Sequence, residues 1–185
     1  MPVEVIIALL TAALTAFGWL VNHVLGERAA RRRLHLEAQL EHTTRQIECL
    51  YGPLAFLIIE GRQVFADLLE SLGRDYVFVE GEALPNGELK TWLFWLDNSF
   101  LPANRQIRNL LRDNAHLIEG DRMPDSCAKF LQHYSSWEIR HQRWQKQQQA
   151  YSWHSSINWP EDFADEVLKT FSELKQRHAR LVGQL

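Results

Sequence analysis

The sequence has few cysteines, no glycine-rich phosphate motif and no excess of charge of either sign. Cys49 and Cys127 are its two cysteines, and neither belongs to a Cys-x-x-Cys pair. This argues against a disulfide framework and a zinc ribbon, and favours a reducing compartment. The nine glycines match neither a P-loop nor a dinucleotide-binding fingerprint, and no Gly-x-Ser-x-Gly elbow occurs. Nucleotide hydrolysis and serine hydrolase chemistry are therefore disfavoured.

The charge balance argues against a nucleic-acid partner. The 20 basic and 23 acidic residues give a net charge of -3, so the chain as a whole lacks the positive charge that attracts phosphate backbones. Apolar residues, by contrast, make up 46% of the 185 residues, with seven tryptophans and nine phenylalanines. This composition predicts a folded chain of about one domain.

A long uncharged stretch lies near the amino terminus. Val5 to Val21 contains no charged residue, and extension to Leu25 adds only Asn22 and His23 as strongly polar side chains. A bilayer's hydrocarbon core is crossed by about 20 helical residues. We therefore predict a transmembrane helix within residues 1–26, with an unusually apolar buried helix as the alternative.

Charges on either side of this stretch predict its orientation. Arg28, Arg31, Arg32 and Arg33 follow it, whereas Glu4 precedes it, which is the reverse of a cleaved signal peptide. Basic residues beside a span stay on the cytoplasmic side. The pattern predicts a single-pass protein of the bacterial inner membrane, with the amino terminus outside, residues 27–185 in the cytoplasm and the arginine cluster at the lipid surface.

Small and polar residues form one stripe along the predicted span. They recur at spacings of three and four: Ala8, Thr11, Thr15, Gly18 and Asn22. Such stripes allow helices to pack closely in lipid, so this one is a candidate face for self-association or, in a ring, for lining a pore. Chance is the alternative, because a threonine can also hydrogen-bond to its own helix.

The rest of the chain predicts an all-α fold. Residues 27–51 are expected to continue the span as an amphipathic stalk, and Gly52-Pro53 is expected to form a tight turn into a helix that Gly73 ends. The run 76–79 favours strand, but an extended segment packed on the helices is the preferred interpretation.

Three further helical regions follow. We expect one between Trp92 and Ile118 that Pro102 kinks or divides, one capped by Asp125 that frays in the polar run 145–149, and one opening at Pro160. Short connections between amphipathic helices predict an up-and-down bundle of four to five helices in residues 27–185.

Two residue pairs are candidates for catalytic or metal sites. Glu138 and His141 form a Glu-x-x-His pair, but carboxylate-bridged dimetal bundles need two such pairs and the chain has one, so a surface pair is favoured. Helical ribonucleases of the HEPN class use an Arg and a His separated by four to six residues, and Arg28 and His35 are the only pair at that spacing. Their position beside the predicted span favours lipid over RNA.

Two polar and aromatic sets are further candidates. One is a polar run expected to cap or solvate the bundle, with a ligand pocket as the alternative: Asn109, Arg112, Asn114 and His116. The other is a set of tryptophans expected in core or subunit contacts rather than in base stacking: Trp92, Trp95, Trp137, Trp144, Trp153 and Trp159.

Several motifs resemble a set of single-pass bacterial membrane proteins of unassigned activity. They are the amino-terminal span, Leu50-Tyr51-Gly52-Pro53-Leu54, Phe100-Leu101-Pro102-Ala103-Asn104 and Ile157-Asn158-Trp159-Pro160. More distantly, the layout is similar to the small membrane accessory protein of type VI CRISPR systems. That resemblance implies a helical protein that oligomerises into a membrane pore and strengthens phage defence. No functional residues are carried over from it.

These observations predict a membrane-anchored protein without enzymatic activity, catalytic residues, metal or cofactor. Its helical domain is expected to bind other copies of the chain, as a homo-oligomer, or a cytoplasmic protein. The first alternative is an oligomeric pore or effector in anti-phage defence. The second is a HEPN-like or metal-dependent enzyme, for which Glu138, His141 and His116 would be the first residues to substitute.

Overall fold

A computed structural model describes residues 2–79, 84–147 and 158–185, without the side chains of Val5, Ile6, Ala8 and Leu9. All regular structure in these residues is helical, which confirms the all-α class. The elements in chain order are α1 (Val3–Gln46), η1 (Ile47–Tyr51), α2 (Gly52–Leu72), α3 (Asn86–Trp95), η2 (Leu96–Phe100), α4 (Leu101–Asp113), η3 (Ala115–Leu117), α5 (Asp125–Gln147) and α6 (Glu161–Val182).

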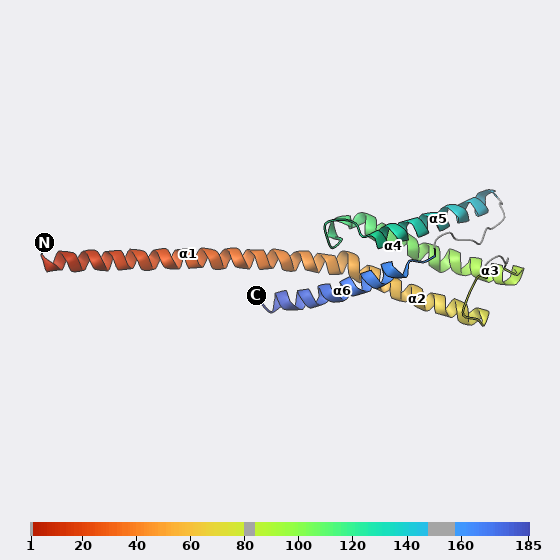
Figure 1. Cartoon of the computed structure of the whole chain (residues 1–185), viewed down its shortest axis with the longest axis horizontal. Helices are drawn as coiled ribbons and strands as arrows, with labels where there is room; N and C mark the ends of the chain where they lie inside the picture. The colour runs from red at the N-terminus through yellow and green to blue at the C-terminus, as the bar shows by residue number, and fades with distance from the viewer. Residues whose placement is uncertain (1, 80–83, 148–157) are drawn as a thin grey trace.

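Helices α1 and α2 form one nearly continuous rod (Figure 1). The expected turn at Gly52-Pro53 is therefore wrong. The chain instead passes through the π-helix η1, where the Gly52 N–H donates to the carbonyl of Ile47, five residues earlier. Proline inside an α-helix clashes with the carbonyl four residues before it, and the wider π turn gives the Pro53 ring room.

The second proline is accommodated in the same way. Pro102 follows the π-helix η2, in which the Leu101 N–H donates to the carbonyl of Leu96. Helices α3 and α4 therefore form a second interrupted rod, in agreement with the prediction that Pro102 kinks or divides this region. Both interruptions are π turns. The local sequence does not distinguish a π turn from a break in the helix.

The end of α2 and the segment after it agree with expectation. Gly73 adopts a left-handed conformation at φ 65°, and its N–H donates to the Glu70 carbonyl while that of Arg74 donates to the Leu69 carbonyl. This is the Schellman arrangement that ends a helix. Within the described residues the following segment forms no strand, and Val77 is buried in an apolar cluster of the bundle.

The last two helices begin close to their predicted positions. Asp125 is the first helical residue of α5 rather than its cap, and the carbonyl of Pro124 accepts from the N–H groups of Cys127 and Ala128. Pro160 directly precedes α6. The polar run 145–149 reaches the end of α5 at Gln147, and its last two residues lie outside the described part.

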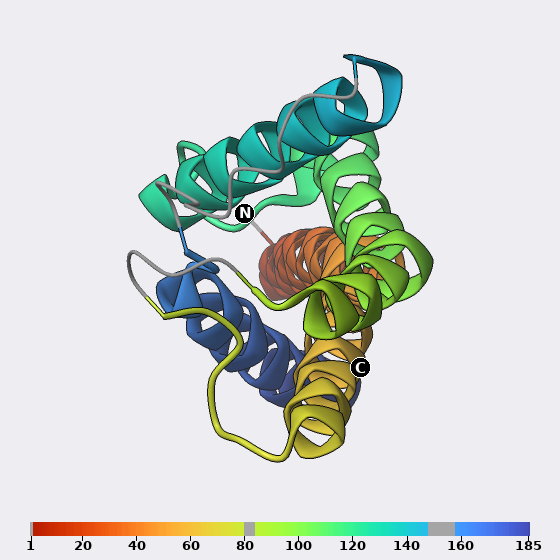
Figure 2. The same ribbon diagram turned by 90° about the vertical axis from the view of Figure 1, so that its right-hand side faces the viewer.

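Four helices close into the predicted up-and-down bundle. Helix α2 packs on α4, α4 on α5, α5 on α6, and α6 on α2, while the carboxyl-terminal end of α1 lies against α6. The chain reverses direction from α2 to α4, again to α5 and again to α6 (Figures 1 and 2). The amino-terminal part of α1 projects alone from one end of this bundle.

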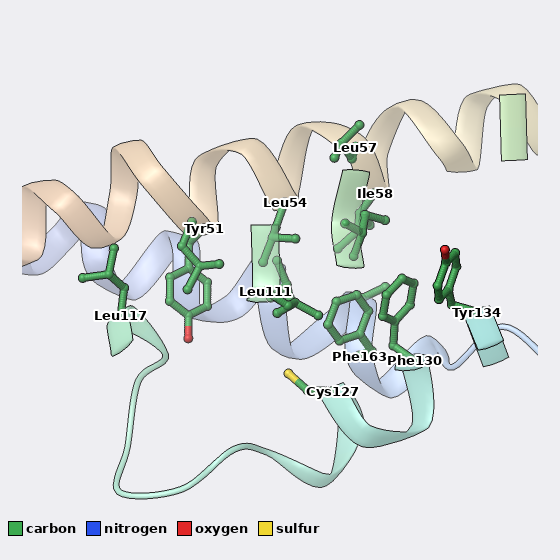
Figure 3. Close-up of a cluster of buried hydrophobic side chains, with 14 of the residues drawn as sticks. Tyr51, Leu54, Leu57, Ile58, Leu111, Leu117, Cys127, Phe130, Tyr134 and Phe163 are labelled. Carbon is green, nitrogen blue, oxygen red and sulfur yellow. The ribbon is translucent and has the colours of Figure 1, made fainter. Parts of the chain in front are cut away.

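Two apolar clusters hold the bundle together. The first core gathers around Phe130 and Phe163, whose rings stack at 4.8 Å, with Leu54 and Ile58 of α2 beside them (Figure 3). The second core surrounds Trp92, against which the Phe78 ring packs edge-on at 4.9 Å. The buried apolar residues of α2 are thus shared between the two cores, with Leu68 in the second core.

Candidate functional site

The amino-terminal part of α1 presents apolar side chains that contact no other element. All side chains described between residues 2 and 35 are exposed. Leu14 is 71% exposed, Phe17 66% and Trp19 68%. Burying such side chains is strongly favourable, and exposed apolar surfaces of this size are typical of sites that bind a partner or a membrane.

The predicted stripe lies on this exposed stretch. The Thr11 hydroxyl donates to the Ile7 carbonyl at 2.9 Å, and the Thr15 hydroxyl donates to the Thr11 carbonyl at 2.8 Å. No heavy atom lies within 4 Å of the position that a side chain on Gly18 would take, and Asn22 is exposed. The side chain of Ala8 lies outside the described part. The hydroxyls therefore satisfy their own helix, and self-association through the stripe stays a prediction.

Among the side chains that the structure describes, no helix combines the length and the apolar character needed to cross a membrane. The membrane-spanning role of residues 1–26 therefore stays a prediction. The predicted domain boundary after Gly26 falls inside α1, which continues through it without a break.

The arginine cluster divides into paired and unpaired members. Arg31 contacts Glu27 at 3.0 Å and Arg33 contacts Glu37 at 2.8 Å, each across one helical turn. Within the described residues, no carboxylate pairs with Arg28 or Arg32. The cluster thus holds two arginines whose charge is locally balanced and two whose charge is not.

The Glu-x-x-His pair on α5 serves contacts between helices. Arg105 of α4 binds Glu138 with a nitrogen–oxygen distance of 2.9 Å. The Nε2 atom of His141 lies 2.6 Å from Oδ1 of Asp97 in η2. The expectation of a surface pair is wrong for His141, which is buried. Across the described part of the chain, no three potential ligands gather as a metal would require.

The ribonuclease-like pair lies away from the bundle. Arg28 and His35 are both exposed on the projecting part of α1, and the ring Nε2 of His35 lies 2.9 Å from the amide nitrogen of Gln39. An RNA-cleaving pair needs to face one cleft where phosphate can be held. The two residues occupy a single exposed helix surface instead.

The polar run on α4 caps and solvates the helix, as expected. The Asn114 amide donates to the Leu110 carbonyl at 3.2 Å, the Asn109 side chain accepts from Arg108 at 2.8 Å, and Arg112 pairs with Asp113. His116 is exposed.

The tryptophans inside the described ranges agree with the core interpretation, because each is at least half-buried: Trp92, Trp95, Trp137, Trp144 and Trp159. Trp92 belongs to the second core, and Trp137 packs on it with ring centroids 5.7 Å apart. Trp159 packs on Phe130 of the first core. Trp153 lies outside the described residues.

A buried polar contact that the sequence did not reveal joins α1 to the bundle. The Gln46 amide donates to the Leu117 carbonyl at 3.0 Å and to the Glu119 carboxylate at 2.8 Å. Arg177 of α6 binds the same carboxylate at 2.7 Å, and the Glu119 N–H donates to the Tyr51 hydroxyl at 2.9 Å. We call these four residues the Glu119 node: Gln46, Tyr51, Glu119 and Arg177.

The node and the first core shift the pKa of several groups. The hydrogen bond from Arg177 lowers the pKa of Glu119. Burial raises the pKa of the Tyr51 hydroxyl, and it raises the pKa of the Cys127 thiol to about 11. Cys127 is therefore a protonated core side chain, whereas Cys49 is exposed. The partners of the node are far apart in sequence, so no local signal could have found it.

Comparison of the chain with protein-family models, with curated proteins and with solved structures finds no match. The resemblances drawn from the sequence motifs therefore stay predictions.

Proposed function

We propose that the amino-terminal part of α1 anchors this protein in a membrane and that the helical bundle binds other copies of the chain or a second protein. The observation that carries the proposal is the exposed apolar stretch of α1. Its uncharged run from Val5 to Val21 has close to the length of a hydrocarbon core. A bilayer is the partner that would cover a long helix whose exposed side chains are mostly apolar.

Orientation and compartment follow from the flanking charges. The arginines after the run would hold the bundle on the cytoplasmic side of a bacterial inner membrane. The amino terminus would then lie on the outer side of that membrane. Two free cysteines suit that reducing side. The bundle is assigned no catalytic role in this proposal, because Glu138 and His141 hold α4 and η2 in place.

Membrane fractionation with a matched pair of variants tests the anchor. Leu14 lies near the middle of the uncharged run and Leu34 lies beyond it, and both are exposed on α1, at 71% and 66%. A charge in the middle of a span costs about 3 kcal/mol, so Leu14→Arg should move much of the chain from carbonate-washed membranes to the supernatant. Leu34→Arg should stay with the membranes.

Two outcomes would contradict the anchor. One is a wild-type chain that carbonate releases from the membrane, and the other is equal release of both variants. The binding role of the bundle is tested separately, by the native mass of the detergent-purified full chain beside residues 27–185. A monomer in both cases would remove self-association and leave binding to a second protein.

A further inference from the structure

We propose that Arg28 and Arg32 form a binding face for anionic phospholipid headgroups, whereas Arg31 and Arg33 do not. The inference rests on the proposed membrane anchor and names the lipid class that its cytoplasmic end would select. The sequence alone treats the four arginines as one cluster. The ion pairs of α1 divide that cluster into two sets.

The division follows from the positions of the two glutamates. Glu27 lies four residues before Arg31, and Glu37 lies four residues after Arg33, so each carboxylate reaches its arginine across one turn of α1. Arg28 and Arg32 are also four residues apart, so their side chains lie on one side of the helix. Within the described residues neither has a carboxylate partner, so their shared side of α1 carries uncompensated positive charge.

The spacing along α1 places this charge at the depth of a headgroup. A helix rises about 1.5 Å per residue, so Arg28 lies about 5 Å and Arg32 about 10 Å beyond Leu25, the end of the apolar stretch. The headgroup layer on each side of a bilayer is about 5–8 Å thick. With the reach of an arginine side chain, both guanidinium groups can contact lipid phosphates from this position.

The chemistry of the face favours a lipid phosphate over other anions. A guanidinium group makes two parallel hydrogen bonds to a phosphate, and basic residues beside a bilayer gain from its negative surface potential. Nucleic acid is a poorer candidate, because the whole chain carries a net charge of -3 and the face is directly continuous with the apolar stretch. We therefore assign the face to anionic phospholipids.

Native mass spectrometry of the full chain, purified in detergent and mixed with equal amounts of phosphatidylglycerol and phosphatidylcholine, measures this selection. The wild type should retain phosphatidylglycerol in preference to phosphatidylcholine. In the double variant Arg28→Gln/Arg32→Gln the preference should fall on the order of tenfold. The matched variant Arg31→Gln/Arg33→Gln loses the same charge and should keep most of the preference.

Each other outcome overturns the inference in a recognisable way. Equal losses in the two double variants would mean that total charge decides, and not the unpaired face. In a second outcome, the wild type shows no lipid preference and yet inserts into liposomes of phosphatidylcholine alone. That result would rule out the lipid selection and leave the anchor standing. A chain that enters no bilayer of either lipid would remove the anchor itself.

Discussion

Gly52 is the residue on which the junction between α1 and α2 depends. Its backbone is ordinary for a helix, at φ -65° and ψ -54°, so it is not needed for a left-handed conformation. A side chain there would, however, place its first carbon 2.6 Å from the carbonyl oxygen of Ile47. The π turn brings that oxygen close, and only a residue without a side chain leaves it room.

Replacing Gly52 with alanine should therefore destabilise the protein. Alanine gains about 1 kcal/mol over glycine inside a helix, but the contact with a backbone oxygen forces the π turn to shift, at a cost of about 1–3 kcal/mol or more. We expect a lower midpoint of thermal unfolding for Gly52→Ala than for the wild type. Circular dichroism of the detergent-purified chain measures this midpoint.

Gly61 provides the matched control in the same helix. No heavy atom lies within 4 Å of the position its side chain would take. Alanine has the higher helix propensity, so Gly61→Ala should stabilise the protein by about 0.5–1 kcal/mol and raise its unfolding midpoint. A raised unfolding midpoint in both variants would mean that the π turn does not require glycine.

The elements themselves were largely predictable, because their ends depend on local chemistry. Gly73 ends α2 and Pro160 precedes α6, as their conformational preferences indicate. The junction at Gly52-Pro53 was mispredicted because the same two residues suit a turn and a π-helix equally well. Helix α6 packs against this junction, with the Phe171 ring 3.6 Å from the position of a Gly52 side chain, and the local residues carry no sign of that contact.

At the scale of the elements, the Glu119 node joins α1 to α6, and its contribution to stability depends on pH. Because Arg177 lowers the pKa of Glu119 below its ordinary value of 4.5, the folded state prefers the carboxylate. The resulting stabilisation is complete above pH 4.5 and disappears as the pH falls through the lowered pKa. Both side chains are partly exposed, so the ion pair is worth less than about 1 kcal/mol.

Glu119→Gln should accordingly lower the free energy of unfolding at pH 7, and the difference from the wild type should vanish in acid. Denaturant unfolding at a series of pH values measures this. Glu173→Gln is the control on α6, since Glu173 reaches Lys169 only at 3.9 Å and both side chains are well exposed. A loss from Glu119→Gln that persisted in acid would assign the effect to packing rather than to charge.

At the scale of the whole molecule, the bundle and the projecting helix have separate sources of stability. The 44 residues of α1 extend about 66 Å, yet burial begins only near its end, at Thr43 and Gln46. The all-α class followed from the succession of amphipathic helices in the sequence. The order in which the helices pack did not, because contacts such as Gln46 with Leu117 join residues that no local pattern connects.

Residues 27–185 should therefore fold without the stretch that precedes them. Since all side chains described from residue 2 to residue 35 are exposed, removing residues 1–26 takes none of the described contacts from either core. We expect the unfolding midpoint of the shortened chain to lie close to that of the full chain in the same detergent, with amide protection unchanged in α2, α4, α5 and α6. Loss of cooperative unfolding would show instead that the bundle depends on the apolar stretch or on what covers it.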